Sequence, residues 1–208
     1  MIKKLLSLFA GRKDLKPVII VSGLPRSGTS LMMKMLEAGG ITVLTDNMRE
    51  ADDDNPKGYY EFEKVKMLPE GNHTWLTNAH GKAVKIIFSL LSFLPPTYSY
   101  RAIFMRRSMP EIIASQRKML IRNEKDPDSV SEREIALLFE KLVSEVYFVA
   151  KRKDNFSFIE VNYKQLLDNP IPELHQISNF LGKDSNVDKM AQVIDHTLYR
   201  QRHISDSS

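Results

Sequence analysis

The feature that most constrains this chain is a glycine-bracketed loop between an apolar run and a helical pattern. Residues 17–21 read Pro-Val-Ile-Ile-Val, a β-rich run that predicts a buried strand. In residues 29–38 apolar side chains recur at helical spacing, and Gly39-Gly40 ends the pattern. The loop between them, residues 23–30, reads Gly-Leu-Pro-Arg-Ser-Gly-Thr-Ser. Such a turn aims backbone N–H groups and the positive end of a helix dipole at one point, which predicts a phosphate or sulfate site. The plainer alternative is a tight turn whose hydroxyls only cap the helix.

Strand-like and helical segments alternate along the rest of the chain. Strands are expected at 41–44, 83–88, 100–105 and 156–161, and helices at 110–121, from 131 onward, at 172–181 and at 186–199. The helix from 131 opens with the capping-box spacing of Ser131 and Glu134. Its expected apolar face consists of Ile135, Leu138, Leu142, Val146 and Val149. The alternation predicts an α/β fold, a single-domain parallel sheet with helices on both faces. Ligands of such sheets bind outside the carboxyl ends of the strands.

Length and composition limit the classes of protein to consider. A chain of 208 residues with 42% hydrophobic and 27% charged residues fits one folded domain, which we place at 16–208 after an amphipathic segment at 1–15. The absence of cysteine excludes disulfides, thiolate metal sites and cysteine nucleophiles. It also fits a reducing compartment, so we expect a cytoplasmic protein. The net charge of +4 suits an anionic ligand, although surplus surface lysine explains it equally well.

Several kinds of partner are not expected. Basic residues are scattered and no platform of interleaved aromatic and basic residues is present, so nucleic-acid binding is disfavoured. No apolar run approaches the roughly 20 residues of a membrane span, although residues 1–10 could make weak peripheral contact with a membrane. The histidines lack metal-ligand spacing, and we expect no metal.

The loop differs from the standard loop that binds nucleoside triphosphates. In that loop a lysine follows the second glycine and reaches the β- and γ-phosphates. Here Thr29 holds the lysine position, and the only cation of the loop, Arg26, precedes the second glycine. No apolar strand ends in an aspartate that could bind magnesium. A metal-dependent small-molecule kinase is therefore the alternative rather than the leading hypothesis.

The segment 25–30, Pro-Arg-Ser-Gly-Thr-Ser, resembles the 5′-phosphosulfate loop of sulfotransferases that use 3′-phosphoadenosine 5′-phosphosulfate, P-[KR]-S-G-T-[ST]. The arginine version is similar to the bacterial and Golgi-type branch. The resemblance implies a P-loop-containing sulfotransferase-like fold and this nucleotide as co-substrate. It implies that the phosphosulfate is held by Arg26, Ser27, Gly28, Thr29 and Ser30. A sulfuryl group carries less charge than a phosphoryl group, so amides, hydroxyls and one arginine could suffice without magnesium.

Two further elements of the resemblance lie later in the chain. The family binds the 3′-phosphate of its donor with an arginine at a strand end and a serine eight positions on, which Arg107 and Ser115 match. Arg106 stays open as an alternative, because Arg-Ser-Met-Pro replaces the family's Arg-Asp-Pro. The run 161–170 resembles the strand–Tyr-Glu-Asp-Leu…Pro segment of the family, and implies that Tyr163 lies near the adenine. An ordinary tyrosine at the edge of the core is an equal alternative.

Transfer to an alcohol needs a base near the attacking oxygen. Golgi-type members use a glutamate at the end of the strand after the loop helix, and the resemblance places Asp46 there. A capping or turn aspartate is the alternative for this residue. Other candidates for the base are Glu50, Asp52, Asp53, Asp54, Glu61, His73 and His80.

The leading hypothesis is a sulfotransferase that moves a sulfuryl group to a hydroxyl or amine of an unknown small-molecule, glycan or peptide acceptor. Arg26 and Asp46 are the expected catalytic residues. The alternatives are the kinase considered above and a non-catalytic protein that only binds the adenosine bisphosphate nucleotide.

Overall fold

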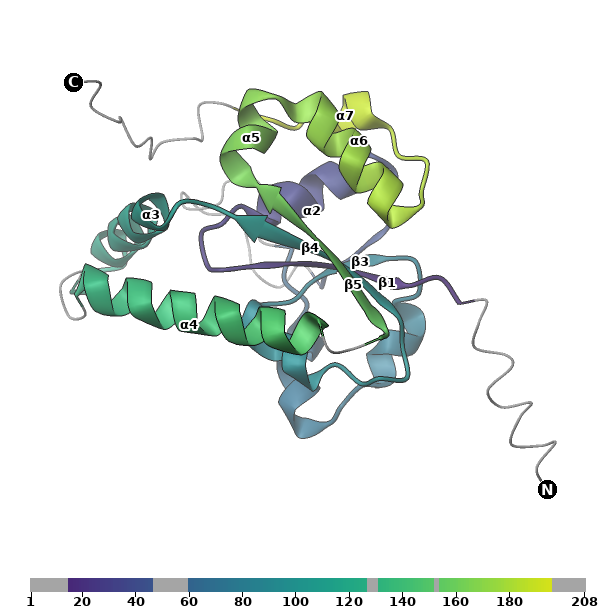
Figure 1. Ribbon diagram of the computed structural model, residues 1–208, viewed down its shortest axis with the longest axis horizontal. Helices are drawn as coiled ribbons and strands as arrows, with labels where there is room; N and C mark the ends of the chain where they lie inside the picture. The colour runs from purple at the N-terminus through teal and green to yellow at the C-terminus, as the bar shows by residue number, and fades with distance from the viewer. Residues whose placement is uncertain (1–14, 47–59, 127–130, 152–153, 196–208) are drawn as a thin grey trace.

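A central parallel sheet organises the molecule. The computed structural model describes residues 15–46, 60–126, 131–151 and 154–195. Its strands are β1 (Val18–Gly23), β2 (Val43–Leu44), β3 (Ala83–Lys85), β4 (Tyr100–Arg106) and β5 (Phe156–Asn162). They form one five-stranded sheet in the order β2-β3-β1-β4-β5, and every adjacent pair is parallel (Figure 1). The predicted parallel α/β fold is confirmed.

Helices cover both faces of this sheet, as predicted. One face carries α2 (Thr29–Ala38), α5 (Tyr163–Asp168), α6 (Pro170–Leu181) and α7 (Val187–Ala191), which lie above the sheet in Figure 1. The other face carries α4 (Glu132–Lys151) and the 3₁₀ helices η1 (Glu63–Glu70), η2 (Thr74–Asn78) and η3 (Phe88–Phe93). The helix α3 (Met109–Arg122) follows β4 and extends away from the carboxyl end of the sheet.

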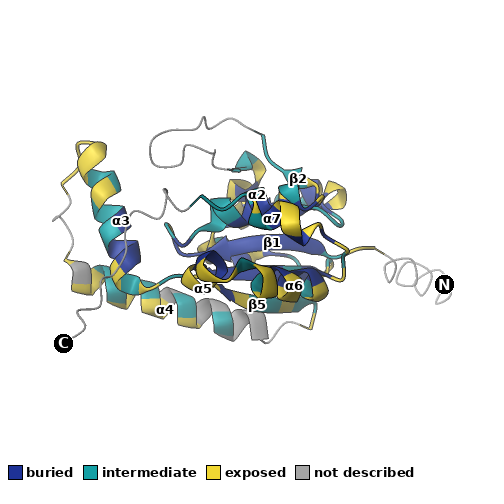
Figure 2. Cartoon of the chain, turned by 90° about the horizontal axis from the view of Figure 1, so that it is seen from above, coloured by how far each residue is buried: buried dark blue, intermediate teal, exposed yellow. Residues whose placement is uncertain are grey.

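The central strand β1 contributes to the core on both sides. Ile19 and Val21 pack in the cluster beneath α2 and α6, whereas Val18 and Ile20 pack in the cluster with the 3₁₀ helices. All four side chains are at most 2% exposed, and Figure 2 shows β1 in the colour of buried residues. Because successive strand residues face opposite sides, a strand buried on both faces must be apolar throughout. This explains why the run at 17–21 lacks polar residues.

Some elements differ from the sequence-based expectations. The strand expected at 83–88 ends at Lys85, because η3 begins at Phe88. The helix expected at 186–199 ends at Ala191, and Val193 and Ile194 pack against the core instead of continuing it. The 3₁₀ helices and α5 were not anticipated. Most of the segment predicted at 1–15 lies outside the described residues.

The apolar face of α4 also differs from the prediction. Phe139, Val143 and Tyr147 pack against the cluster that contains Leu24 and Phe104. Leu138, expected on that face, is instead 53% exposed. Val143 and the aromatic residues Phe139 and Tyr147 therefore make the described contact of α4 with this cluster. The side chains of Leu142, Val146 and Val149 lie outside the described part of the structure.

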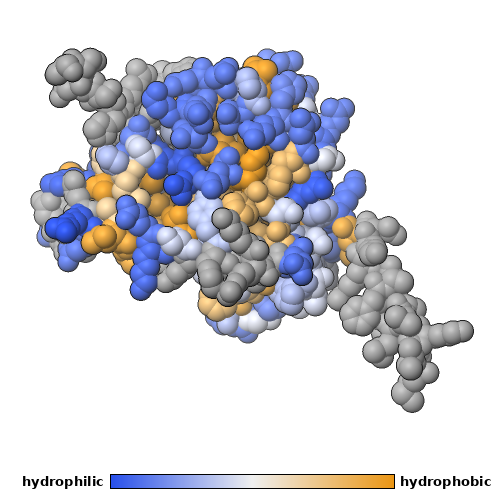
Figure 3. Space-filling view, viewed as in Figure 1, coloured by the Kyte–Doolittle hydropathy of each residue, from blue (hydrophilic) through white to orange (hydrophobic). Residues whose placement is uncertain are grey.

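The outer surface is mixed. Figure 3 shows hydrophilic side chains over the upper helices and apolar side chains among polar ones near α3 and α4. In that region Ile121, Leu137 and Leu138 are more than half exposed. No helix within the described ranges is long and apolar enough to cross a membrane.

Candidate functional site

The loop between β1 and α2 has the backbone shape of an anion-binding turn. Gly28 caps α2 with a φ of 100°, and Arg26 has a φ of 69°, so both occupy the left-handed region. Thr29 and Ser30 begin the helix, where N–H groups have no partner within the helix itself. The N–H of Ser27 donates to the carbonyl of Leu24 at 3.1 Å, and the Ser27 side chain is fully buried. The Ser27 N–H is therefore engaged within the loop, and the contact of Ser27 with a phosphosulfate stays a prediction.

Arg26 is joined to two of the residues that the sequence placed at the 3′-phosphate. Its Nε donates to Ser115 Oγ at 2.9 Å, across 89 positions of sequence. Its carbonyl accepts from Arg107 Nη1 at 3.1 Å, across 81 positions. The loop, the end of β4 and the second turn of α3 thus converge on one hydrogen-bonded cluster. We call Arg26, Arg107 and Ser115 the arginine cluster.

Arg107 is held on several sides. Its Nε donates to Glu111 Oε2 at 2.8 Å, and the two side chains are only 9% and 5% exposed. Its guanidinium carbon lies 4.7 Å from the centre of the Tyr163 ring, within the range of a cation–π contact. Arg106 lies elsewhere: its side chain is 46% exposed and 3.6 Å from Glu160. The arginine that joins the loop is therefore Arg107.

Tyr163 packs against both the arginine cluster and the loop backbone. A Cβ added to Gly28 would come within 2.4 Å of its ring, so the loop backbone and the ring are in close contact. Burial raises the pKa of the Tyr163 hydroxyl, although nearby Arg107 and Arg26 oppose the shift. The phenol is therefore protonated at neutral pH. Its contact with an adenine stays a prediction.

Lys85 is a second cation at the loop that the sequence analysis missed. It ends β3, next to β1 in the sheet, and its Nζ donates to Ser30 Oγ at 3.4 Å. Glu111 was missed as well. A lysine inside the apolar run 83–88, and a carboxylate four positions after Arg107, were the available signals.

Asp46 lies just past β2, and its hydrogen bonds to backbone groups are typical of a turn residue. Its Oδ2 accepts from the N–H of Glu63 at 2.6 Å, where η1 begins, and its own N–H donates to the Glu61 carbonyl at 3.3 Å. Among the other candidates for the base, His80 lies at the amino-terminal ends of the strands, away from the loop. Its Nδ1 is 3.1 Å from the carbonyl of Lys16, which precedes β1. Glu61 lies beside Asp46 through the backbone bond just described. Glu50, Asp52, Asp53 and Asp54 lie outside the described residues.

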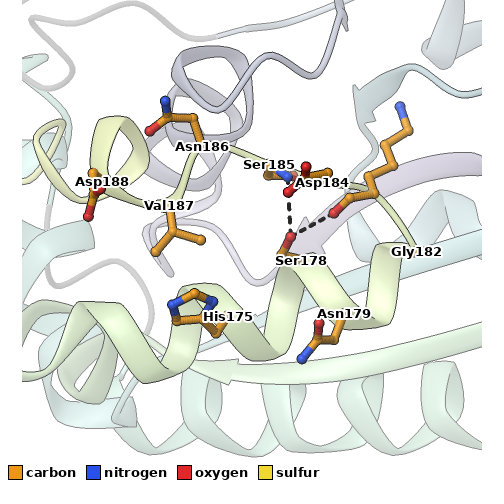
Figure 4. Close-up of a pocket in the computed structure, with 10 residues that line it drawn as sticks. His175, Ser178, Asn179, Gly182, Asp184, Ser185, Asn186, Val187 and Asp188 are labelled. Atoms are coloured by element: carbon orange, nitrogen blue, oxygen red, sulfur yellow. Dashed lines mark hydrogen bonds between the residues drawn. The ribbon is translucent and has the colours of Figure 1, made fainter.

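A polar cavity elsewhere does not belong to this site. It measures about 680 Å³ and lies between α6 and α7, where Figure 4 shows His175, Asn179 and Asn186 around it. Within it Ser178 Oγ donates to the Lys183 carbonyl at 2.6 Å and accepts from the N–H of Ser185 at 3.4 Å. These bonds close the turn between the two helices. Among the described residues no group of three or more histidine, aspartate or glutamate side chains could hold a metal ion.

Fold and site together define a protein of the α/β class in which a strand–loop–helix turn is joined by hydrogen bonds to Arg107 and Ser115. The family model of the sulfotransferase domain matches residues 16–203. The chain therefore belongs to the sulfotransferase family, and it is an enzyme of the sulfotransferase class.

Solved structures agree with this fold. Sulfotransferase STF1 from Mycobacterium tuberculosis H37Rv is 15% identical with a TM-score of 0.58, over 92% of this chain and 74% of that one. The sulfotransferase domain of the Synechococcus PCC 7002 olefin synthase is 17% identical with a TM-score of 0.53, over 88% and 80%. Mouse sulfotransferase SULT7A1, complexed with PAP, is 19% identical with a TM-score of 0.53, over 92% and 67%. No curated protein matches the chain.

Proposed function

We propose that this sulfotransferase takes its sulfuryl group from 3′-phosphoadenosine 5′-phosphosulfate and transfers it, in line and without a metal, to a hydroxyl or amine acceptor. The observation that carries the proposal is the arginine cluster. Arg107 and Ser115, more than 80 positions after Arg26, meet it at the N-terminus of α2, where a helix favours an anion. A nucleotide that carries anionic groups on both the 5′ and the 3′ positions of its ribose suits a site with two neighbouring arginines. The mouse relative that was solved with PAP supports the same nucleotide class.

Each part of the nucleotide has a proposed partner. Arg26 and the N–H groups of Gly28, Thr29 and Ser30 would hold the 5′-phosphosulfate. Lys85, bonded to the Ser30 hydroxyl, would add positive charge where the sulfuryl group leaves.

At the other end of the nucleotide, Arg107 and Ser115 would bind the 3′-phosphate. Guanidinium and hydroxyl groups are suitable partners for a phosphate monoester. Ser115 already accepts from Arg26, so its O–H remains a donor for a phosphate oxygen.

Asp46 is proposed to accept the proton from the acceptor. It follows β2 at the carboxyl edge of the sheet, the edge from which the loop also emerges. The bond from the Glu63 N–H fixes one of its oxygens, which would orient the carboxylate. A cytoplasmic location is part of the proposal, and the lack of cysteine fits it.

Thermal unfolding with added nucleotides tests the donor assignment. Adenosine 3′,5′-bisphosphate at about 100 times its Kd should stabilise the wild type by about 2.7 kcal/mol, or about 5 to 11 °C in Tm. ATP with magnesium should give a much smaller shift. Arg107→Ala should lose the shift with the bisphosphate.

Arg106→Ala is the matched control, because Arg106 is the adjacent arginine on the opposite side of the strand and is paired with Glu160. It should keep the wild-type shift. Stabilisation by ATP and magnesium alone would instead favour the kinase. Loss of the shift in Arg106→Ala but not in Arg107→Ala would contradict the assignment of the 3′-phosphate site.

A further inference from the structure

The contacts around Arg107 connect a carboxylate outside the expected site to the loop. Glu111 accepts from Arg107 Nε, and Arg107 Nη1 donates to the carbonyl of Arg26. We propose that Glu111 is a positioning residue of the nucleotide site: it fixes the plane of Arg107, so that one guanidinium both supports the turn at Arg26 and meets the 3′-phosphate. The 3′-phosphate half of this inference rests on the proposed function.

The burial of the ion pair is the first argument. The Arg107 and Glu111 side chains are 9% and 5% exposed. Taking two charges out of water is costly, and a buried pair is weak evidence for a stabilising role by itself. A fixed geometry is the gain that such a pair offers. Glu111 lies in the first turn of α3, where the helix dipole favours a carboxylate. Its side chain reaches back to Arg107, two residues before the helix begins.

The second argument is the backbone at Arg26. Its φ of 69° is unfavourable for a residue with a side chain, and such a conformation persists only where the surroundings hold it. The bond from Arg107 Nη1 to the Arg26 carbonyl is one restraint, and the bond from Arg26 Nε to Ser115 is another. Displacement of Arg107 would therefore remove one of these two restraints on the loop.

The third argument is the contact with Tyr163. The ring lies 4.7 Å from the Arg107 guanidinium and fixes the position of its face, while Glu111 fixes an edge. The planar guanidinium, held at one face by Tyr163 and at one edge by Glu111, therefore keeps a single orientation. An alternative role for Glu111 is a competing anion that neutralises Arg107. That role predicts the opposite change in affinity, because removing the negative charge of Glu111 would then strengthen phosphate binding.

Nucleotide affinities of variants separate these roles. Isothermal titration would use adenosine 3′,5′-bisphosphate and adenosine 5′-monophosphate, which lacks the 3′-phosphate. Glu111→Ala should weaken binding of the bisphosphate about tenfold, and of the monophosphate clearly less. Glu111→Gln, which keeps an oxygen acceptor of the same shape, should recover most of the loss. In an Arg107→Ala background, Glu111→Ala should have no further effect on the ratio of the two affinities.

Asp168→Ala is the matched control. Asp168 pairs with Lys164 at 2.9 Å with the same four-residue spacing, but both side chains are more than half exposed. It should leave both affinities unchanged. Unfolding curves would show whether each variant is folded. If Glu111→Ala alone does not fold, Glu111→Gln and the Arg107→Ala double variant, which leaves no unpaired buried arginine, still give the comparison.

Three results would overturn the inference. These are an unchanged affinity ratio in a folded Glu111→Ala, tighter bisphosphate binding by Glu111→Gln, and losses that simply add in the double variant. A wild type that binds both nucleotides equally would instead overturn the proposed 3′-phosphate site. The two failures are therefore distinguishable.

Discussion

Gly28 meets two demands at the residue where the loop enters α2. Its φ of 100° disfavours any side chain, and a Cβ there would lie 2.4 Å from the Tyr163 ring. We expect Gly28→Ala to destabilise the fold by about 2 to 5 kcal/mol, from backbone strain and overpacking together. Because Tyr163 would be pushed from beneath Arg107, binding of adenosine 3′,5′-bisphosphate should also fall. Chemical denaturation and titration of the same preparation measure both effects.

Gly40→Ala provides the comparison for that prediction. Gly40 has a φ of 89°, but no atom lies within 4 Å of an added Cβ. Only the strain of about 1 to 2 kcal/mol should appear, with nucleotide binding unchanged. Equal costs at the two glycines would mean that the contact with Tyr163 has no role.

Some residues of the site could be predicted from the sequence, and others could not. The loop is local, so its spacing alone indicated an anion site. The choice between Arg106 and Arg107 follows from the alternation of a strand: Phe104 and Arg106 face the α4 side, whereas Met105 packs in the cluster beneath α2. The bond between Arg26 and Ser115 joins positions 89 apart, and no local pattern encodes it.

At the scale of elements, the N-terminus of α4 shows a capping box with a titratable partner. Ser131 Oγ donates to Glu134 Oε2 at 2.6 Å, and the Ser131 N–H donates to the same oxygen at 3.0 Å. These bonds favour the carboxylate and lower the pKa of Glu134 below its ordinary value of 4.5. A group with a lowered pKa in the folded state stabilises above its unfolded pKa, and the contribution is lost as pH falls through the folded value.

Glu134→Ala should therefore lower Tm slightly at pH 7, and the difference from wild type should shrink as the pH falls below about 4.5. Calorimetry between pH 3 and 7 measures this. Ser131→Ala removes the larger cause of the shift and should reduce the pH dependence in the same way. A difference that stays constant over the whole range would show that helix propensity, and not the carboxylate, is responsible.

The elements also show where sequence patterns stop being informative. The main strands and α2 are long or strongly apolar, and their positions are close to those predicted. The 3₁₀ helices lack a clear period, so the stretch from 63 to 93 gave no helical signal. In α4 the apolar residues occupy more than one face. Packing against Leu24 and Phe104 selects the face with Phe139, and periodicity alone could not.

At the scale of the molecule, both helical layers share β1, the strand from which the loop at residues 23–30 emerges. Leu36 of α2 and Leu76 of η2 are fully buried in the clusters on opposite faces of the sheet. Because β1 belongs to both clusters, we expect one cooperative unfolding transition. Leu36→Ala and Leu76→Ala should each cost about 2 to 5 kcal/mol and lower the same Tm by about 4 to 20 °C.

Scanning calorimetry checks this, with Leu137→Ala as the control because that side chain is 57% exposed. The control should move Tm by no more than about 2 °C. Two transitions, each sensitive to only one of the buried variants, would show that the layers unfold separately. If the two layers unfold together, Leu76→Ala should also lower the fraction of molecules near Tm in which the loop at residues 23–30 is folded. This should hold although η2 lies on the face of the sheet opposite α2. Bisphosphate binding would then raise the single Tm of both variants by similar amounts, because the ligand is linked to the whole fold rather than to one layer.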